Sequence, residues 1–137
     1  MKKIVSSLSV VVLLLLCLVA TGCQAEPEVT GIWADATYNK DATLGEGAVA
    51  MKMVIAAEEK SITLTINTNK ETVAEALKEH NLIKGSEGLY TVVNGMTADY
   101  NVDQTYWAFY ENEAYANQGM DTTKIDPAVT YKLVRSK

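Results

Sequence analysis

Two hydrophobic periodicities meet in the middle of this chain and constrain its fold more than any other feature. Residues 49–56 and 61–67 each carry an apolar side chain at every second position, which is the spacing of strands with one buried face. A short charged turn separates them, so we expect an antiparallel hairpin with one face toward solvent. Residues 72–81 then change to helical spacing. Thr72 and Glu75 have the spacing of a capping box, which predicts that the helix begins there.

The rest of the chain predicts a small sheet that this helix covers. Three more segments have strand composition, namely residues 89–94, 106–111 and 130–134. Asn94-Gly95 predicts a turn, residues 85–88 a loop, and residues 32–47 an irregular segment in which Trp33 packs onto the edge of the domain. One helix over one face of a small mixed sheet is an α+β fold, and the order of elements is β-grasp-like.

The N-terminal residues have the layout of a secretory signal. Lys2 and Lys3 open the chain, residues 10–20 are apolar, and small residues precede Cys23. A cysteine at this place resembles the lipobox of bacterial lipoproteins, in which the thiol receives a diacylglycerol and the chain is cut before it. We therefore expect a signal peptide at 1–22, a tether at 23–31, a domain at 32–137, and a lipid-anchored protein on the extracellular face of the cell membrane.

Two other interpretations of this segment stay open. It is an ordinary signal peptide, cut near Cys23, or it is a permanent transmembrane helix. The apolar stretch is about half of the roughly 20 residues that span a bilayer comfortably. Cys17 lies inside this stretch, so Cys23 would be the one cysteine of the exported part. A single thiol in an oxidising compartment has no disulfide partner, which favours lipidation.

Length and charge narrow the classes of function. Residues 23–137 suit one small domain with a single core. They carry 10 basic and 17 acidic side chains, a net charge of −7. This balance argues against binding to nucleic acid and against a basic membrane-binding face.

The sequence spells out no reactive site. His80 is the single histidine, and it lies on the predicted helix, where a place at the border of the core is more common than a metal ligand. No serine–histidine or cysteine–histidine pair can be assembled without that residue. The glycine pairs lack the lysine and the strand-to-helix setting of a phosphate loop. We therefore expect neither an enzyme nor a cofactor.

Aromatic residues are the remaining chemical feature. Alternation in residues 106–110 places Trp107 and Phe109 on one face of a strand, and Tyr106 and Tyr110 on the other. One set belongs to the core, and the other is exposed or half-exposed. Exposed rings with hydroxyl tips suit a flat, partly polar ligand or a protein partner. The alternative is that these tyrosines only fill a sheet, where their propensity is high.

The order and spacing of several short segments resemble the transcobalamin-like C-terminal domain family of bacterial surface lipoproteins. The segments that carry the resemblance are residues 32–38, 43–48, 71–77, 88–90, 93–100, 106–110, 115–125 and 130–133. The family is named after the C-terminal domain of transcobalamin and intrinsic factor, the animal vitamin B12 carriers. The resemblance implies a β-grasp-like domain that binds a small molecule, such as cobalamin or another corrinoid, without chemistry.

The segment from the aromatic strand to residue 121 matches the family's tryptophan strand and the glycine-containing segment that follows. The resemblance therefore implies a ligand site made by Tyr106, Trp107, Tyr110, Tyr115, Asn117 and Gln118. The alternative function is a protein–protein interaction or adhesion module of the cell envelope.

The chain departs from the family in three ways, one of which is Asp126-Pro127-Ala128 where relatives have Asp-Gly before the last strand. Many relatives have Asn-Gly after the aromatic strand, whereas this chain has Asn112-Glu113. Glutamate is poor at the positive φ of a tight primed turn, so we expect a wider turn here. The animal carriers hold the corrinoid mainly with a separate helical domain, which this sequence lacks. A β-domain offers one side of such a pocket.

Overall fold

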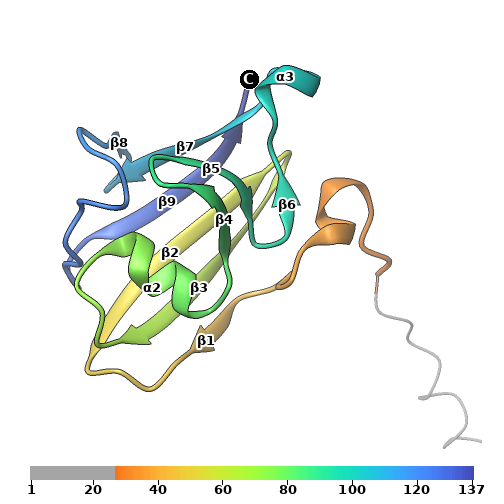
Figure 1. Ribbon diagram of the computed structural model, residues 1–137. Coiled ribbons are helices and arrows are strands. Elements are labelled where there is room, and N and C mark those ends of the chain that lie inside the picture. Colours follow the sequence, from red (N-terminus) through yellow and green to blue (C-terminus); the bar gives the residue numbers. More distant parts are fainter. Residues whose placement is uncertain (1–26) are drawn as a thin grey trace, which may run out of the picture.

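The two alternating segments form the centre of a six-stranded sheet (Figure 1). The computed structural model describes residues 27–137, and the predicted signal peptide and Cys23 lie outside this range. β2 (Val49–Ala57) and β3 (Lys60–Thr68) pair antiparallel along their whole length. The sheet is mixed, because β1 (Ala42–Leu44) pairs in parallel with β3, and β9 (Thr130–Ser136) in parallel with β2.

The aromatic strand lies near one edge of this sheet. β7 (Tyr106–Glu111) pairs antiparallel with β9, and the two-residue strand β8 (Ala114–Tyr115) follows it. The strand order is therefore β1-β3-β2-β9-β7-β8. Because β8 pairs with β7 only at Tyr110 and Glu111, the first part of β7 has no strand beside it on that edge.

A second layer covers one face of the main sheet (Figure 1). It consists of α2 (Val73–Glu79) and a three-stranded sheet of β4 (Ile83–Ser86), β5 (Leu89–Val93) and β6 (Met96–Thr97). Two short helices, η1 (Gly31–Asp35) and α3 (Tyr100–Asp103), complete the described chain. Within residues 27–137, no helix is long and apolar enough to cross a membrane.

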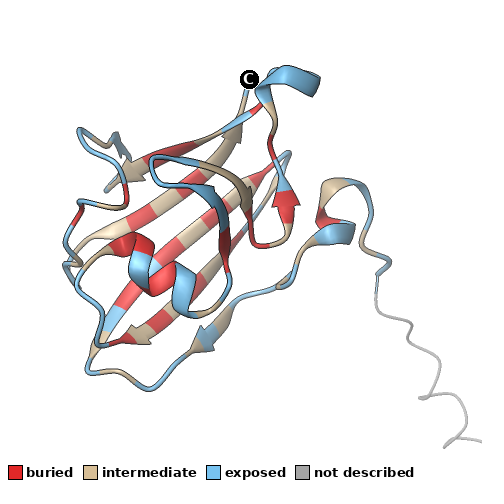
Figure 2. Cartoon of the chain, viewed as in Figure 1, coloured by how far each residue is buried: buried red, intermediate tan, exposed pale blue. Residues whose placement is uncertain are grey.

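The core fills the space between these two layers. Buried and partly exposed residues alternate along β2, β3 and β9 (Figure 2), as strands with one covered face require. Met53, Leu64 and Leu133 are fully buried from the main sheet, and Leu77 is fully buried from α2. Trp33 is also buried and donates from Nε1 to the carbonyl of Ala57 at 2.9 Å, which confirms that it packs onto the edge of the domain.

The five predicted strands and the predicted helix all form, in an α+β arrangement dominated by strands. The helix begins as predicted, because the Thr72 side chain accepts from the Glu75 amide at 3.4 Å and Glu75 accepts in return from the Thr72 amide at 3.1 Å. These bonds satisfy amides that a helix start leaves without partners. The predicted turn at Asn94-Gly95 is confirmed too, with positive φ at both residues.

The prediction of a single sheet was wrong. Residues 85–88, predicted as a loop, contain the end of β4, so a second sheet forms. Gly85 has φ +141°, and a Cβ there would lie 2.4 Å from the Leu89 carbonyl oxygen. The glycine is therefore a point of close strand approach rather than a loop signal. Residues 32–47 are also more ordered than predicted, because they contain most of η1 and the whole of β1.

The expectation of a wide turn after the aromatic strand was wrong as well. Glu111 pairs with Ala114, so Asn112 and Glu113 form a tight two-residue turn with φ of 46° and 68°. Asn112 both donates to and accepts from the backbone of Thr130, at 2.9 Å each. Tertiary contacts to β9 therefore hold a glutamate in a conformation that its intrinsic preference disfavours.

Candidate functional site

Two adjoining hollows open beside the aromatic strand, and together we call them the aromatic groove. The first has a volume of about 100 Å³ and is lined by Gly88, Tyr90, Trp107, Phe109, Gly119, Met120 and Asp121. The second has a volume of about 270 Å³ and is lined by Trp107, Phe109 and residues 115–119. Trp107, Phe109 and Gly119 line both hollows, so the two hollows lie side by side.

The aromatic wall of the groove consists of Trp107 and Phe109, and contacts to neighbouring strands hold both rings in place. Phe109 stacks on Tyr131 of β9, with ring centroids 6.0 Å apart and an interplanar angle of 17°. The Trp107 indole donates from Nε1 to the carbonyl of Thr91 on β5 at 3.3 Å. Both contacts keep ring surface available at the groove without a change of rotamer on binding, which reduces the entropy lost when a ligand binds.

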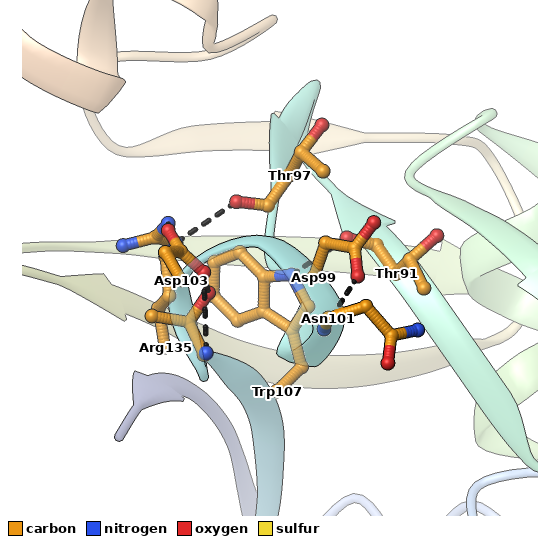
Figure 3. Close-up of polar contacts among 8 residues, drawn as sticks. Thr91, Thr97, Asp99, Asn101, Asp103, Trp107 and Arg135 are labelled. Atoms are coloured by element: carbon orange, nitrogen blue, oxygen red, sulfur yellow. Dashed lines mark hydrogen bonds and ion pairs between the residues drawn. The ribbon is translucent and has the colours of Figure 1, made fainter.

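Arg135 secures the segment around Trp107 (Figure 3). It lies directly opposite Trp107 in the β7–β9 pair. Its Nε donates to the carbonyl of Thr97 at 2.9 Å, and its Nη2 donates to Asp103 at 2.8 Å. Asp103 also accepts from the Thr105 side chain and, at 3.2 Å, from the Thr105 amide. One arginine thus ties β9 to the end of β6 and to α3.

Asp121 closes the other end of the groove. Its carboxylate accepts from the Gly88 amide at 2.9 Å and from the Tyr90 hydroxyl, and it lies 3.6 Å from Lys78 Nζ on α2. Burial opposes its ionisation, but the hydrogen bonds from Tyr90 and Gly88 and the charge of Lys78 outweigh burial and hold the pKa of Asp121 below its ordinary value. Burial, together with the bond to Asp121, raises the pKa of Tyr90.

This carboxylate predicts an acid-sensitive contribution to stability. Because the pKa of Asp121 is lower in the folded than in the unfolded protein, its contribution is present above the unfolded value of about 4 and is lost as pH falls toward the folded value. We expect the free energy of unfolding of Asp121→Asn to fall less between pH 5 and pH 2.5 than that of the native chain. Urea unfolding across this range measures the difference, and parallel pH profiles would contradict it.

The structure separates the six residues that the resemblance implied as the ligand site. Trp107, Tyr115, Asn117 and Gln118 line the second hollow of the groove. Tyr106 and Tyr110 lie on the opposite face of β7. The Tyr110 ring meets the Tyr115 ring edge-on, with centroids 5.3 Å apart. The role of all six in binding stays a prediction.

Sequence reasoning did not select seven of the groove residues, and three of these, Phe109, Tyr90 and Asp121, have side chains that shape the site. Phe109 shares the face of Trp107, and strand alternation alone would have added it. Tyr90 and Asp121 are 31 positions apart, and nothing in the local pattern indicates that they meet. Their pairing follows from the second sheet, which brings β5 over β7.

The groove offers contact surfaces rather than metal ligands. Among residues 27–137, no group of three or more His, Cys, Asp or Glu side chains is arranged to hold a metal ion. The lining consists of aromatic rings, small residues, two amides, a methionine and one carboxylate that is already hydrogen-bonded. Such a lining can stack on a flat molecule and donate and accept hydrogen bonds at its rim.

Comparison with known proteins places the fold. Residues 70–130 match the sequence profile of a domain of unknown function (DUF4430), and this segment contains every residue of the groove. No curated protein matches the chain significantly. A proposed metal-binding protein from Ruminococcus gnavus ATCC 29149 is similar in structure, with a TM-score of 0.60 and 19% sequence identity, over 65% of this chain and 97% of that chain. The two proteins therefore share a fold.

A second similar structure is haptocorrin in complex with Cbi. It has a TM-score of 0.47 and 17% sequence identity. The similarity covers 69% of this chain but only 27% of the haptocorrin chain.

Proposed function

We propose that this chain is a β-grasp-like extracellular domain that binds a small molecule in the aromatic groove without altering it. The observation that carries the proposal is the meeting of two hollows on Trp107, Phe109 and Gly119. Their combined size is near the lower end of the range of ligand pockets, about 300 Å³. A fixed aromatic wall and a hydrogen-bonding rim are the usual composition of such pockets.

The ligand class that we propose is a corrinoid, on the basis of the resemblance to the transcobalamin-like C-terminal domain family. The geometry is compatible with one side of a flat ligand. Trp107 and Phe109 offer ring surface, while Asn117 and Gln118 are exposed at the rim and can bond polar substituents. Because one wall of the groove is open, we expect an affinity in the micromolar range, about −8 kcal/mol, rather than the tight binding of an enclosed site.

Equilibrium dialysis with cobinamide and with cobalamin tests this proposal. Trp107→Ala is expected to weaken retention at least about tenfold, the effect of losing a central aromatic contact of 1.4 kcal/mol or more. Tyr106→Ala is the matched control, because it removes a neighbouring ring from the opposite face of the same strand. Equal losses in both variants, or no retention of either corrinoid at high micromolar concentration, would remove the proposal of a corrinoid in this groove.

We further propose that Cys23 carries the lipid that anchors the domain to the outside of the membrane. The basic start, the apolar segment 10–20 and the small residues before Cys23 support this. Cys23→Ser is expected to prevent lipid attachment and to release the protein from the membrane fraction. Globomycin, which blocks lipoprotein signal cleavage, is expected to cause accumulation of the longer precursor. A native protein that matures normally under globomycin would contradict the anchor.

A further inference from the structure

Exposed apolar side chains gather at one end of the domain. In the described residues, five large hydrophobic side chains are exposed, and three of them lie on α3 or just after it: Tyr100 at 65%, Val102 at 81% and Tyr106 at 41%. We propose that this patch, the α3 patch, rests on the lipid headgroup region of the membrane to which the domain is anchored. The proposal rests on lipidation of Cys23.

Strand register places the α3 patch at a defined end of the main sheet. Tyr106, at the start of β7, pairs with Ser136 at the end of β9. The parallel partner of this part of β9 is the end of β2, where Ala56 pairs with Val134. The β2–β3 turn, the C-terminus and α3 therefore share one end of the sheet, as Figure 1 also shows.

The N-terminal end of the described chain is fixed at the same end. Trp33 of η1 donates to the carbonyl of Ala57, the last residue of β2, and Gly31 lies against the Glu58 carboxylate in the β2–β3 turn. Pro27 follows Cys23 by four positions, which limits the distance between them to about 14 Å even in a fully extended chain. A lipid on Cys23 would therefore keep this end of the domain close to the bilayer.

The exposure of the patch does not come from a loose helix. The Asp99 side chain accepts from the Asn101 amide at 2.9 Å and caps the start of α3. Asp103 at its end is held by Arg135 and by Thr105 (Figure 3). These bonds hold both ends of α3 in place while Tyr100 and Val102 stay exposed to solvent.

The chemistry of the patch fits the membrane interface. Tyrosine is enriched at that depth because its ring is apolar and its hydroxyl prefers water. A helix of four residues is too small to bind a bilayer by itself, so the contact depends on the anchor, which keeps the patch at high local concentration near the surface. The domain is acidic, so charge does not attract it to an anionic membrane. Since salt screens the repulsion between like charges, we expect the contact not to weaken when the salt concentration is raised.

This orientation leaves the groove open to the outside. Tyr115 pairs with Tyr110, and Tyr110 pairs with Lys132 near the start of β9. Tyr115 therefore lies away from the α3 patch, which is beside the end of β9. Leu89 is next to Gly88, whose amide donates a hydrogen bond to Asp121. Asp121 belongs to the segment that accepts hydrogen bonds from the first residues of α2. Tyr115 and Leu89 are the other two exposed hydrophobic side chains, and they flank the groove rather than the anchored end.

Site-specific fluorescence in lipid vesicles tests the α3 patch. The full chain is expressed with Val102→Cys or, as matched control, Leu89→Cys, and the lipidated protein is labelled with an environment-sensitive nitrobenzoxadiazole probe. The native chain contains only Cys17 and Cys23, so the introduced thiol is the one free site after lipidation and cleavage. The proteins are reconstituted into phosphatidylcholine–phosphatidylglycerol vesicles with and without a doxyl-labelled quencher lipid.

We expect a blue-shifted emission at position 102, quenched by the doxyl lipid, and neither effect at position 89. Tyr100→Cys serves as a second reporter of the same patch. If Cys23 carries lipid by mass spectrometry but positions 100 and 102 are not quenched, or position 89 is quenched equally, the contact is wrong and the anchor stands. If the probe at position 102 is shielded from water in native envelopes but not in vesicles, the α3 patch binds a protein partner, and the proposed membrane contact is wrong. If Cys23 carries no lipid, the anchor and the contact both fall.

Discussion

Replacing Asn94 by alanine is expected to lower the free energy of unfolding by about 3 kcal/mol, a large part of the total for a domain of this size. Asn94 is fully buried and has φ of 53°. Its side chain donates to the Tyr38 carbonyl at 2.7 Å and accepts from the Tyr38 amide at 2.9 Å. Its own backbone amide donates to Leu82 and its carbonyl accepts from Thr37. One residue therefore joins the N-terminal segment to the second sheet.

Asn94→Gly separates the loss of the side-chain hydrogen bonds from the strain of a left-handed backbone at an alanine. Glycine tolerates the left-handed backbone but loses the side-chain bonds, so we expect about 2 kcal/mol of destabilisation for glycine and about 1 kcal/mol more for alanine. Urea unfolding followed by circular dichroism measures both. If alanine were no worse than glycine, backbone strain would not contribute. A loss below about 1 kcal/mol for either would show that the bonds to Tyr38 add little.

The parts of the fold that the sequence predicted are those with local, repeated signals. The β2–β3 hairpin and α2 each bury a regular face, and the spacing of that face is visible in the sequence. The second sheet was missed because β4 and β6 are short and depend on partners rather than on their own pattern. Gly85 indicates a loop when only its sequence neighbours are considered. In the structure a residue without a side chain is required there, because β4 and β5 approach closely. Intrinsic preference also failed at Glu113, where contacts to β9 hold the turn.

In the candidate site, too, local patterns predicted some features, and contacts between distant segments were missed. Alternation placed Trp107 and Phe109 on one face, which is the face that lines the groove. It could not tell which face of β7 the second layer would cover. The resemblance grouped Tyr106 and Tyr110 with Trp107, although in the structure they lie on the opposite face of β7 and line neither hollow. The contact of Tyr90 with Asp121 depends on β5, on α2 through Lys78 and on the segment after β8. Contacts among separate segments of this kind have no local sequence signal.

The largest expected effect on ligand binding comes from Gly119→Val. Gly119 lines both hollows, and a Cβ added there would meet no atom within 4 Å. Its φ is not in the left-handed region, so valine causes no backbone strain of that kind. The hydrogen bonds of its carbonyl, including the one from the Thr123 hydroxyl at 2.9 Å, involve no side chain of residue 119. The new side chain would therefore enter open space at a residue that lines both hollows.

We expect Gly119→Val to reduce cobinamide retention at least about tenfold, or 1.4 kcal/mol, while its unfolding free energy stays within about 1 kcal/mol of the native value. Gly119→Ala is expected to give a smaller loss, since one methyl group fills less of the junction. Ala114→Val is the matched control, because it adds the same branched bulk at an exposed position that lines neither hollow. Unimpaired retention by a stably folded Gly119→Val protein would argue against a ligand in the groove, since Gly119 is one of the three residues that line both hollows.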